Sequence, residues 1–205
     1  MPVKKGLLIV FEGIDGSGKS TQASLLKRKL EKRGYDVACF SEPSESRWGL
    51  KIKKEALFPD SLTPEEELSL FVRDRKENVK KNVLPALKRG KIVILDRYYF
   101  STISYQGAKG IDTRRIRDMN ESFAPRPDLV FILDVEPETG LKRIRDRKQK
   151  MRLFEQEEYL VRVREIFRQI KGSNVIHVDA SKKEEEVAEQ IEKIVFGFLK
   201  NTPLC

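Results

Sequence analysis

The residues Gly13 to Ser20 carry the spacing G-x-x-x-x-G-K-S, and they directly follow the apolar run Leu7 to Phe11. This order predicts a buried strand, a glycine-rich loop and the start of a helix, which is the setting in which the motif binds phosphates. The loop glycines let backbone N–H groups point at phosphate oxygens, and the helix adds the positive end of its dipole. Lys19 reaches the outer phosphates, and the Ser20 hydroxyl is a ligand for Mg²⁺. The motif therefore predicts a nucleoside triphosphate site. Its structural alternative is a plain glycine turn between a strand and a helix.

The size and composition of the chain favour one globular domain over residues 1–205. A chain of 205 residues can bury a core, and 39% hydrophobic with 36% charged residues is typical of a protein with a highly charged surface. No apolar stretch has the length of a membrane span, and the apolar run near the N-terminus is too short for a signal peptide. The two cysteines, Cys39 and Cys205, do not indicate a disulfide framework. We therefore expect a protein of the reducing cytoplasm with no membrane partner.

Much of the excess positive charge, +9 in total, lies in one short segment. Between positions 142 and 152 a single acid, Asp146, accompanies seven basic residues. These are Lys142, Arg143, Arg145, Arg147, Lys148, Lys150 and Arg152. Nucleic-acid binders commonly add aromatic side chains for base stacking, and this segment has none. We therefore expect a small, highly charged ligand here and no nucleic acid, with a solvated helix face as the alternative.

Apolar runs and helical patterns alternate along the chain. The runs predict strands at 7–12, 37–40, 92–95, 129–133 and 175–178. Helices are predicted at about 19–33, 48–57, 64–88 and 183–199, the third capped by Thr63 and bent at Pro85. Strands that are apolar throughout and separated by helices indicate a parallel sheet covered on both faces. We expect an α/β fold.

Asp96-Arg97-Tyr98 follows the predicted strand 92–95, at the edge of the sheet where ligands of such folds bind. Asp96 fits the acidic position that holds Mg²⁺ through water, and Arg97 can pair with a phosphate. A surface salt bridge at the end of a strand is the alternative. Asp134 also ends an apolar strand and competes with Asp96 for the metal.

The long predicted helix carries a cation on its apolar side. Its apolar stripe consists of Leu68, Phe71, Val72, Val79 and Val83, and Arg75 falls on the same stripe. A buried guanidinium needs a partner, because leaving it unpaired costs several kcal/mol. A nucleobase carbonyl is one candidate partner, with the Phe71 ring one turn away to stack on the base. The alternatives are a structural ion pair for Arg75 and a core role for Phe71.

Further segments match one family in order and spacing. They are Phe11 to Gln22, Glu42-Pro43, Leu70-Phe71 with Arg75, Asp96-Arg97-Tyr98, Ser101-Thr102, Tyr105-Gln106-Gly107, Pro127-Asp128-Leu129, Arg152 with Phe154-Glu155, Arg162-Val163-Arg164 and Val178 to Ser181. Together they resemble the thymidylate kinase family, nucleoside monophosphate kinases that transfer the γ-phosphate of ATP to dTMP. The resemblance implies a P-loop kinase fold with a five-stranded parallel sheet, and a homodimer.

The resemblance also implies roles for individual residues. The ATP site would comprise Gly13, Ile14, Asp15, Gly16, Ser17, Gly18, Lys19, Ser20, Thr21, Arg143 and Ala180. The dTMP site would comprise Asp15, Glu42, Phe71, Arg75, Arg97, Thr102, Tyr105 and Gln106, with Tyr105 under the sugar. Catalysis would depend on Lys19, Asp15, Arg97, Arg147 and Arg152, the last two in a lid segment at about 142–156. Ser20 and Asp96 would hold Mg²⁺.

The sequence departs from the family pattern at the acceptor site. Members usually carry an arginine just before Glu-Pro, whereas this chain has Ser41 there. Arg47, on the other side of the turn, could supply the charge. The lid also differs, reading Met151-Arg152-Leu153-Phe154-Glu155. A divergent paralogue that acts on another deoxynucleotide or deoxynucleoside is therefore an alternative.

A monophosphate acceptor explains why no catalytic histidine is evident. Its phosphate is largely ionised at pH 7, so no general base is needed, and the single histidine, His177, lies in a predicted strand away from the motifs. A nucleoside acceptor would instead need a carboxylate base, for which Glu12 and Glu42 are candidates. From a different class, an ATP-driven switch or a nucleic-acid-binding P-loop protein is the remaining alternative.

Overall fold

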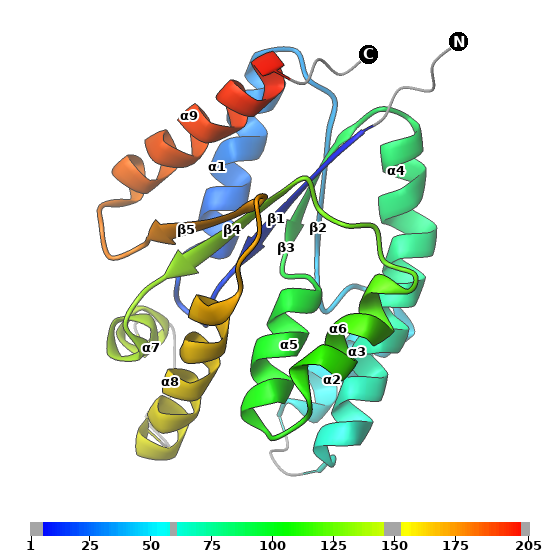
Figure 1. Cartoon of the computed structure of the whole chain (residues 1–205), viewed down its shortest axis with the longest axis vertical. Coiled ribbons are helices and arrows are strands. Elements are labelled where there is room, and N and C mark those ends of the chain that lie inside the picture. The colour runs from blue at the N-terminus through cyan, green and yellow to red at the C-terminus, as the bar shows by residue number, and fades with distance from the viewer. Residues whose placement is uncertain (1–5, 58–60, 146–152, 202–205) are drawn as a thin grey trace.

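The computed structural model describes residues 6–57, 61–145 and 153–201, and a five-stranded sheet forms its centre (Figure 1). The strand order is β2-β3-β1-β4-β5, and all neighbouring strands run parallel. The strands are β1 (Leu7–Glu12), β2 (Val37–Ser41), β3 (Ile92–Asp96), β4 (Leu129–Asp134) and β5 (Val175–Asp179). Each lies where its apolar run predicted it. The predicted α/β fold with a five-stranded parallel sheet is confirmed.

β1 is the central strand, and its carboxyl end lies level with those of its neighbours. All six of its residues are buried, because β3 and β4 flank it and helices cover the sheet. Phe11 of β1 is in register with Asp96 of β3 and Phe131 of β4, and the two phenyl rings stack with centroids 5.4 Å apart. The loops that follow these three strands therefore meet at one edge of the sheet, where α/β proteins bind ligands.

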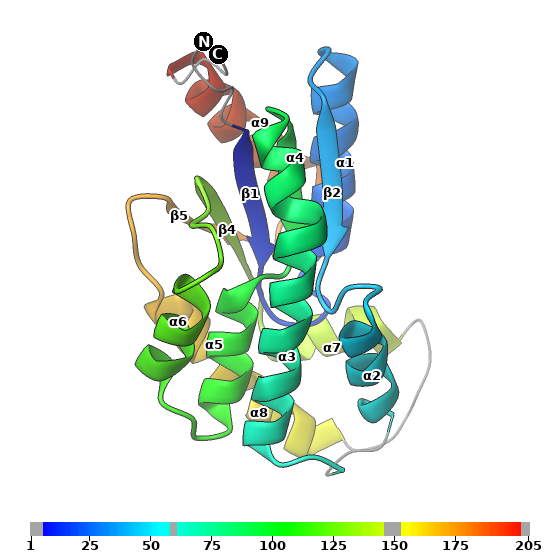
Figure 2. The ribbon, with the colours of Figure 1, turned by 90° about the vertical axis from the view of Figure 1, so that its right-hand side faces the viewer.

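The helices are numbered in chain order. They are α1 (Lys19–Lys32), α2 (Arg47–Glu55), α3 (Pro64–Asn78), α4 (Leu84–Lys88), α5 (Tyr99–Ala108), α6 (Thr113–Glu121), α7 (Pro137–Arg145), α8 (Leu153–Gln169) and α9 (Glu184–Asn201), with a π-helical segment, η1 (Val79–Val83), between α3 and α4. α1 and α9 lie together on one face of the sheet, and α4 lies on the other (Figure 1). α2, α3, α5, α7 and α8 extend beyond the carboxyl edge (Figure 2). In the three described ranges, no helix is both long and apolar enough to span a membrane.

The predicted long helix is continuous from α3 through η1 to α4 (Figure 2). Thr63 caps it in a reciprocal arrangement with Glu66, as the sequence predicted. At the predicted bend, the turn before Pro85 is π-helical: the N–H of Leu84 donates to the carbonyl of Val79, five residues back. Since Pro85 has no N–H to donate, the wider turn occurs where the α-helical bonding pattern is interrupted in any case.

Helices α5 and α6 occupy a stretch for which the sequence pattern indicated no element. α5 is rich in aromatic and β-branched residues, which favour strands, and most of its residues are buried, so no amphipathic period marks it. Its N-cap residue, Tyr98, provides no capping side chain. The cap comes instead from Glu12 on β1, which is distant in the sequence and therefore absent from any local pattern.

Candidate active site

The loop between β1 and α1 forms the predicted phosphate cradle. Gly16 and Gly18 have φ values of 77° and 94°, a left-handed conformation that glycine adopts without steric cost. Gly18 is the N-cap residue of α1 and has no side chain to cap it. The first N–H groups of α1 are therefore available to an anion at the positive end of the helix dipole.

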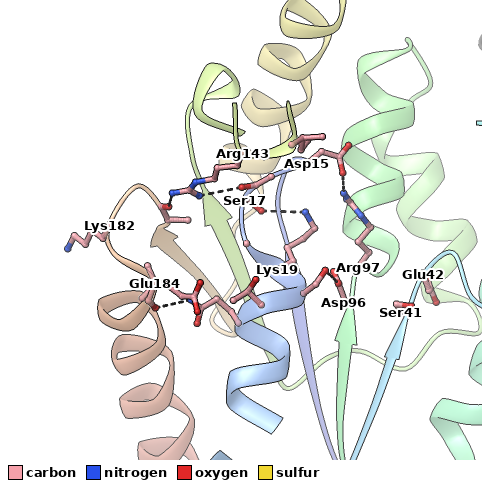
Figure 3. A pocket seen from close by; sticks show the side chains of 18 residues that line it. Asp15, Ser17, Lys19, Ser41, Glu42, Asp96, Arg97, Arg143, Lys182 and Glu184 are labelled. Carbon is pink, nitrogen blue, oxygen red and sulfur yellow. Dashed lines mark hydrogen bonds and ion pairs between the residues drawn. The ribbon is translucent and has the colours of Figure 1, made fainter. Parts of the chain in front are cut away.

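Lys19 lies folded over this loop with only 6% of its surface exposed (Figure 3). Its ammonium group donates to the carbonyl of Ile14 at 2.7 Å and to the Ser17 hydroxyl at 3.4 Å. Burial, followed by the neighbouring charge of Arg97, lowers the pKa of Lys19 to about 7. A phosphate bound in the loop would favour the charged form of the lysine and raise this pKa again.

A cavity of about 710 Å³ opens above the loop (Figure 3). Nine of the predicted ATP contacts line it: Asp15, Gly16, Ser17, Gly18, Lys19, Ser20, Thr21, Arg143 and Ala180. Gly13 and Ile14 do not; their carbonyl oxygens accept hydrogen bonds from Arg97 and Lys19. Arg143 of α7 donates to the carbonyls of Gly16, at 3.3 Å, and Ala180, at 3.0 Å. The cavity therefore has walls from the cradle, α7 and the loop after β5, which is enough to enclose a nucleotide on several sides.

The two predicted metal ligands meet at the floor of this cavity. The Ser20 hydroxyl donates to the Asp96 carboxylate in a short hydrogen bond. Oxygen ligands of this kind suit Mg²⁺, which is usually held by one or two protein oxygens together with substrate phosphates. The described residues contain no cluster of three or more histidine, cysteine, aspartate or glutamate side chains that could hold a metal ion. Asp134, the competing candidate, is instead paired with Arg164 through contacts of 2.6 and 3.3 Å.

A second cavity, of about 570 Å³, adjoins the first. All eight residues predicted for the acceptor line it, namely Asp15, Glu42, Phe71, Arg75, Arg97, Thr102, Tyr105 and Gln106. Three of them, Asp15, Glu42 and Arg97, line both cavities. The structure therefore brings the whole predicted set together and places a guanidinium between two compartments.

Arg97 is held from three sides. Its guanidinium pairs with the Asp15 carboxylate (Figure 3). It also donates to the Gly13 carbonyl at 3.3 Å and to the Ser101 hydroxyl at 3.0 Å. It also lies over the Tyr105 ring, 5.2 Å from its centroid. The guanidinium is therefore fixed in orientation before any ligand binds, which is the preorganisation that recognition of a phosphate requires.

Arg75 is 1% exposed and forms the ion pair that was the structural alternative for it. It donates to the Glu42 carboxylate at 2.7 Å, the Asn120 side chain at 2.6 Å and the Thr102 hydroxyl at 2.9 Å. These contacts engage all three guanidinium nitrogens, and Nη2 also lies 2.7 Å from the Glu42 carboxylate, so at least one of the five N–H groups of Arg75 has no partner among these residues. Burial raises the pKa of Glu42, while the charge of Arg75 opposes that shift. Because Arg75 also lines the acceptor cavity, the ion pair is compatible with a contact to a ligand.

Aromatic and amide side chains form part of the remaining walls of the acceptor cavity. The Tyr105 hydroxyl donates to the Asp15 carboxylate at 3.1 Å. The Gln106 amide donates to Glu67 at 2.9 Å, while Phe71 is half-buried at the cavity wall. A flat apolar surface opposite a few fixed polar groups is the composition expected for a site that binds a nucleobase and its sugar.

Sequence reasoning missed several residues at this cavity. Lys53 of α2, Lys109 after α5 and Tyr159 of α8 line it, and Tyr159 donates to the Tyr105 carbonyl at 2.8 Å. Asn120 of α6 accepts from Arg75 without lining the cavity. A lysine on an amphipathic helix looks solvated in the sequence, and no local pattern indicates that α6 and α8 pack against α5. No signal within the sequence could therefore have identified them.

Some predicted residues are not placed in the site. Arg147 and Arg152 lie outside the described residues, as do all of residues 146–152 within the predicted lid segment. Arg47 lines neither cavity, and its guanidinium lies over the Trp48 ring, 4.5 Å from its centroid. Its guanidinium therefore lies outside both cavities in this structure, whereas Ser41, which stands at the position of the usual arginine, lines the first.

The two candidate general bases are both occupied. Glu12 has no exposed surface and accepts hydrogen bonds from Tyr98 and Ser101. Glu42 is paired with Arg75 and also accepts from Asn78 at 3.3 Å. A base must reach the proton that it removes. The engagement of both carboxylates therefore argues against a nucleoside acceptor and for one that is already ionised.

α7 contacts the phosphate loop through two glycines. A Cβ at Gly140 would lie 2.5 Å from the Asp15 carbonyl oxygen, and a Cβ at Gly16 would lie 2.1 Å from the Gly140 carbonyl oxygen. We predict that Gly140→Ala separates α7 from the loop and raises the KM for the nucleotide of the first cavity by about 10- to 100-fold, since such overpacking costs about 1–3 kcal/mol. Steady-state kinetics with each substrate varied in turn measures this. Gly197→Ala is the matched control, because nothing lies within 4 Å of its Cβ position. An unchanged KM in Gly140→Ala would show that the contact is not needed.

Comparison with known proteins agrees with this architecture. A family model described as "Thymidylate kinase" matches residues 11–191. A protein named "Probable thymidylate kinase" from Archaeoglobus fulgidus is 48% identical over 193 residues, covering 94% of this chain and 96% of its own length. Proteins named "Thymidylate kinase" from Akkermansia muciniphila and Brachyspira hyodysenteriae are each 44% identical, covering 93% and 91% of this chain and 91% and 92% of their own lengths.

Proposed function

Because this chain belongs to the thymidylate kinase family, it is a phosphotransferase that phosphorylates dTMP, and we propose that its two cavities bind ATP and dTMP on either side of Arg97. The observation that carries the proposal is the shared wall of Asp15, Glu42 and Arg97 between the cavities. A donor and an acceptor bound there would meet at a fixed cation, as transfer between two phosphates requires.

ATP binds in the first cavity in this proposal. Its phosphates lie on the N–H groups at the start of α1, and Lys19 reaches their outer oxygens. Arg143 and Ala180 border the adenosine end. Support comes from the glycine conformations, the buried ammonium group of Lys19 and the enclosure of the cavity on three sides.

dTMP binds in the second cavity, with its phosphate on Arg97 and its base against Phe71. The N–H groups of Arg75 that Glu42, Asn120 and Thr102 do not use are available to the carbonyl edge of thymine. Tyr105, held by Asp15, lies under the sugar and disfavours a 2′-hydroxyl. Lys53, which also lines this cavity and pairs with Glu45, is the residue we propose to supply the positive charge that the missing arginine at position 41 does not.

The transfer itself consists of alignment and charge neutralisation. The dTMP phosphate is already an ionised nucleophile near pH 7, since its second pKa is about 6. Lys19 and Arg97 stabilise the negative charge that spreads over the transferring phosphoryl oxygens. Enclosure of both nucleotides excludes water, which would otherwise compete as the acceptor.

Mg²⁺ is the proposed cofactor, held at Ser20 and Asp96. When bound, it supplies positive charge to the donor phosphates. The oxygen chemistry of the two side chains and their positions, Ser20 at the start of α1 and Asp96 at the end of β3, support this assignment. We also propose that the protein acts in the cytoplasm, which suits the exposed free thiol of Cys39, and that it forms a homodimer, as its family resemblance implies. Light scattering measures the latter.

ADP release with ATP and a panel of acceptors tests the proposed function. We expect turnover with dTMP, less with dUMP and dCMP, and none with thymidine or DNA, and we expect the rate to fall to background when EDTA replaces Mg²⁺. Thymidine accepted in preference to dTMP would support the nucleoside-kinase alternative. ATP hydrolysis stimulated by DNA alone would support the nucleic-acid alternative.

A further inference from the structure

Glu12 is a buried carboxylate to which the proposed mechanism gives no role. It is the last residue of β1, immediately before the phosphate loop, and has no exposed surface. One of its oxygens accepts the N–H of Tyr98 at 2.8 Å and the N–H of Ser101 at 3.1 Å. The other accepts the Ser101 hydroxyl at 2.5 Å. The charge is therefore directed entirely at the beginning of α5.

Through these contacts the Glu12 side chain caps the start of α5, a helix whose own N-cap residue provides no capping side chain. The first N–H groups of a helix need partners, and Tyr98 at the N-cap position offers no side-chain acceptor. A carboxylate at this end also interacts favourably with the helix dipole. α5 is therefore attached at its first turn to the strand that carries the phosphate loop.

The same contacts hold the backbone of Arg97 in an unusual conformation. Arg97 has a φ of 71°, and among the described residues it is the only one other than glycine with a positive φ. This conformation costs a residue with a side chain about 1–2 kcal/mol, so neighbouring bonds must hold it. Arg97 itself donates to the Phe11 carbonyl at 2.9 Å, and the next N–H, that of Tyr98, donates to Glu12.

The side chain of Arg97 is linked to Glu12 as well. The Ser101 hydroxyl donates to Glu12 and accepts from the Arg97 guanidinium at 3.0 Å. We propose that Glu12 is the positioning residue of the acceptor clamp, fixing the backbone of Arg97 through Tyr98 and its guanidinium through Ser101. This inference rests on the proposed function, in which Arg97 holds the acceptor phosphate.

A carboxylate at this site is costly for stability alone. Burial raises the pKa of Glu12 to about 7, against the opposing effects of its hydrogen bonds with Ser101 and Tyr98 and of the Arg97 charge. Replacing Glu12 by a neutral group of the same size removes this desolvation cost, which offsets part of the stability lost with its hydrogen bonds. The matching amide, glutamine, has only one acceptor oxygen for the three donors that Glu12 satisfies. A kinetic defect without a large loss of stability would therefore identify a positioning role.

Glu12→Gln is the primary test. We expect kcat/KM for dTMP to fall by about 100-fold, while the KM for ATP changes by less than about threefold, because the phosphate cradle keeps its own backbone contacts. Ser101→Ala, which removes only the hydroxyl link, should lower the same parameter by about tenfold. Ser104→Ala is the matched control: its buried hydroxyl lies one turn further along α5 and has no hydrogen-bond partner among the described residues. Circular dichroism and thermal unfolding check that each variant is folded.

A double-mutant cycle with Arg97→Ala separates positioning from a general structural role. If Glu12 acts through Arg97, Glu12→Gln should cost less than about threefold when Arg97 is already alanine. Additive losses, or an equal rise in the KM of both nucleotides, would overturn the inference.

If Glu12→Gln does not fold, the cycle of Ser101→Ala with Arg97→Ala decides in the same way. If Arg97→Ala alone leaves the dTMP kinetics unchanged, the proposed role of Arg97 fails. If Arg97→Ala impairs dTMP turnover but Glu12→Gln does not, only this inference fails.

Discussion

Lys19→Ala is expected to lower kcat for dTMP phosphorylation by about 10³-fold or more, because the ammonium group stabilises charge that develops on the transferring phosphoryl group. Coupled detection of ADP under saturating substrates measures the loss. Lys27→Ala, on the same helix and half-exposed, is the matched control and should keep the activity of the parent protein. A loss smaller than tenfold in Lys19→Ala would contradict the proposed role of the phosphate loop.

Proton uptake gives a second measurement on the same residue. The pKa of Lys19 is lowered to about 7 without ligand, so part of the population is neutral above that pH. Bound phosphates favour the charged lysine, so ATP binding between pH 7 and 8 should take up protons and weaken as the pH rises through this range. Calorimetry in buffers of different ionisation enthalpy detects the uptake. The uptake should disappear in Lys19→Ala.

Arg75→Met is expected to reduce the free energy of unfolding by about 3–5 kcal/mol at pH 8, because it leaves the Glu42 carboxylate buried without its cation. Denaturant titration measures the change. dTMP binding should weaken at the same time, since the variant loses the Arg75 N–H groups that we propose bind the carbonyl edge of thymine. Glu42→Gln combined with Arg75→Met should recover part of the stability but not the affinity for dTMP.

The stability defect of Arg75→Met should depend on pH with a defined sign. Burial already raises the pKa of Glu42, and removing Arg75 removes the effect that opposes the rise. The folded variant then binds a proton at a pH where the unfolded chain does not, so its deficit shrinks as the pH falls from 8 toward 5. A deficit that stays constant over this range would show that Glu42 does not carry the cost.

The parts of the fold that are determined by residues close together in the sequence were predictable. The apolar runs identified the strands, and Thr63 with Glu66 identified the start of α3. α5 was not predictable, because its composition favours a strand and its cap, Glu12, lies more than 80 positions earlier. In that helix, tertiary contacts outweigh local preference.

The candidate site divides in the same way. The phosphate loop and Asp96-Arg97 have local signatures, the apolar stripe of the long helix indicated Phe71 and Arg75, and the resemblance to a family supplied Tyr105. The sequence pattern could not identify which side chain each charged residue of the site pairs with. Arg75 could equally have met a base or an acid, and only packing shows that Glu42 reaches it. Lys53 reads as an ordinary surface lysine until α2 is seen beside the acceptor cavity.

Two consecutive residues at the end of β1, Glu12 and Gly13, belong to the two different nucleotide sites in our proposal. In the proposed mechanism Glu12 positions the acceptor clamp and Gly13 begins the phosphate loop that holds the donor, so a single peptide bond joins the two sites. Insertions or swaps along α2 or α8 should therefore retune which nucleotide is chosen without disturbing the reaction geometry, whereas one extra residue at the joint should abolish turnover altogether.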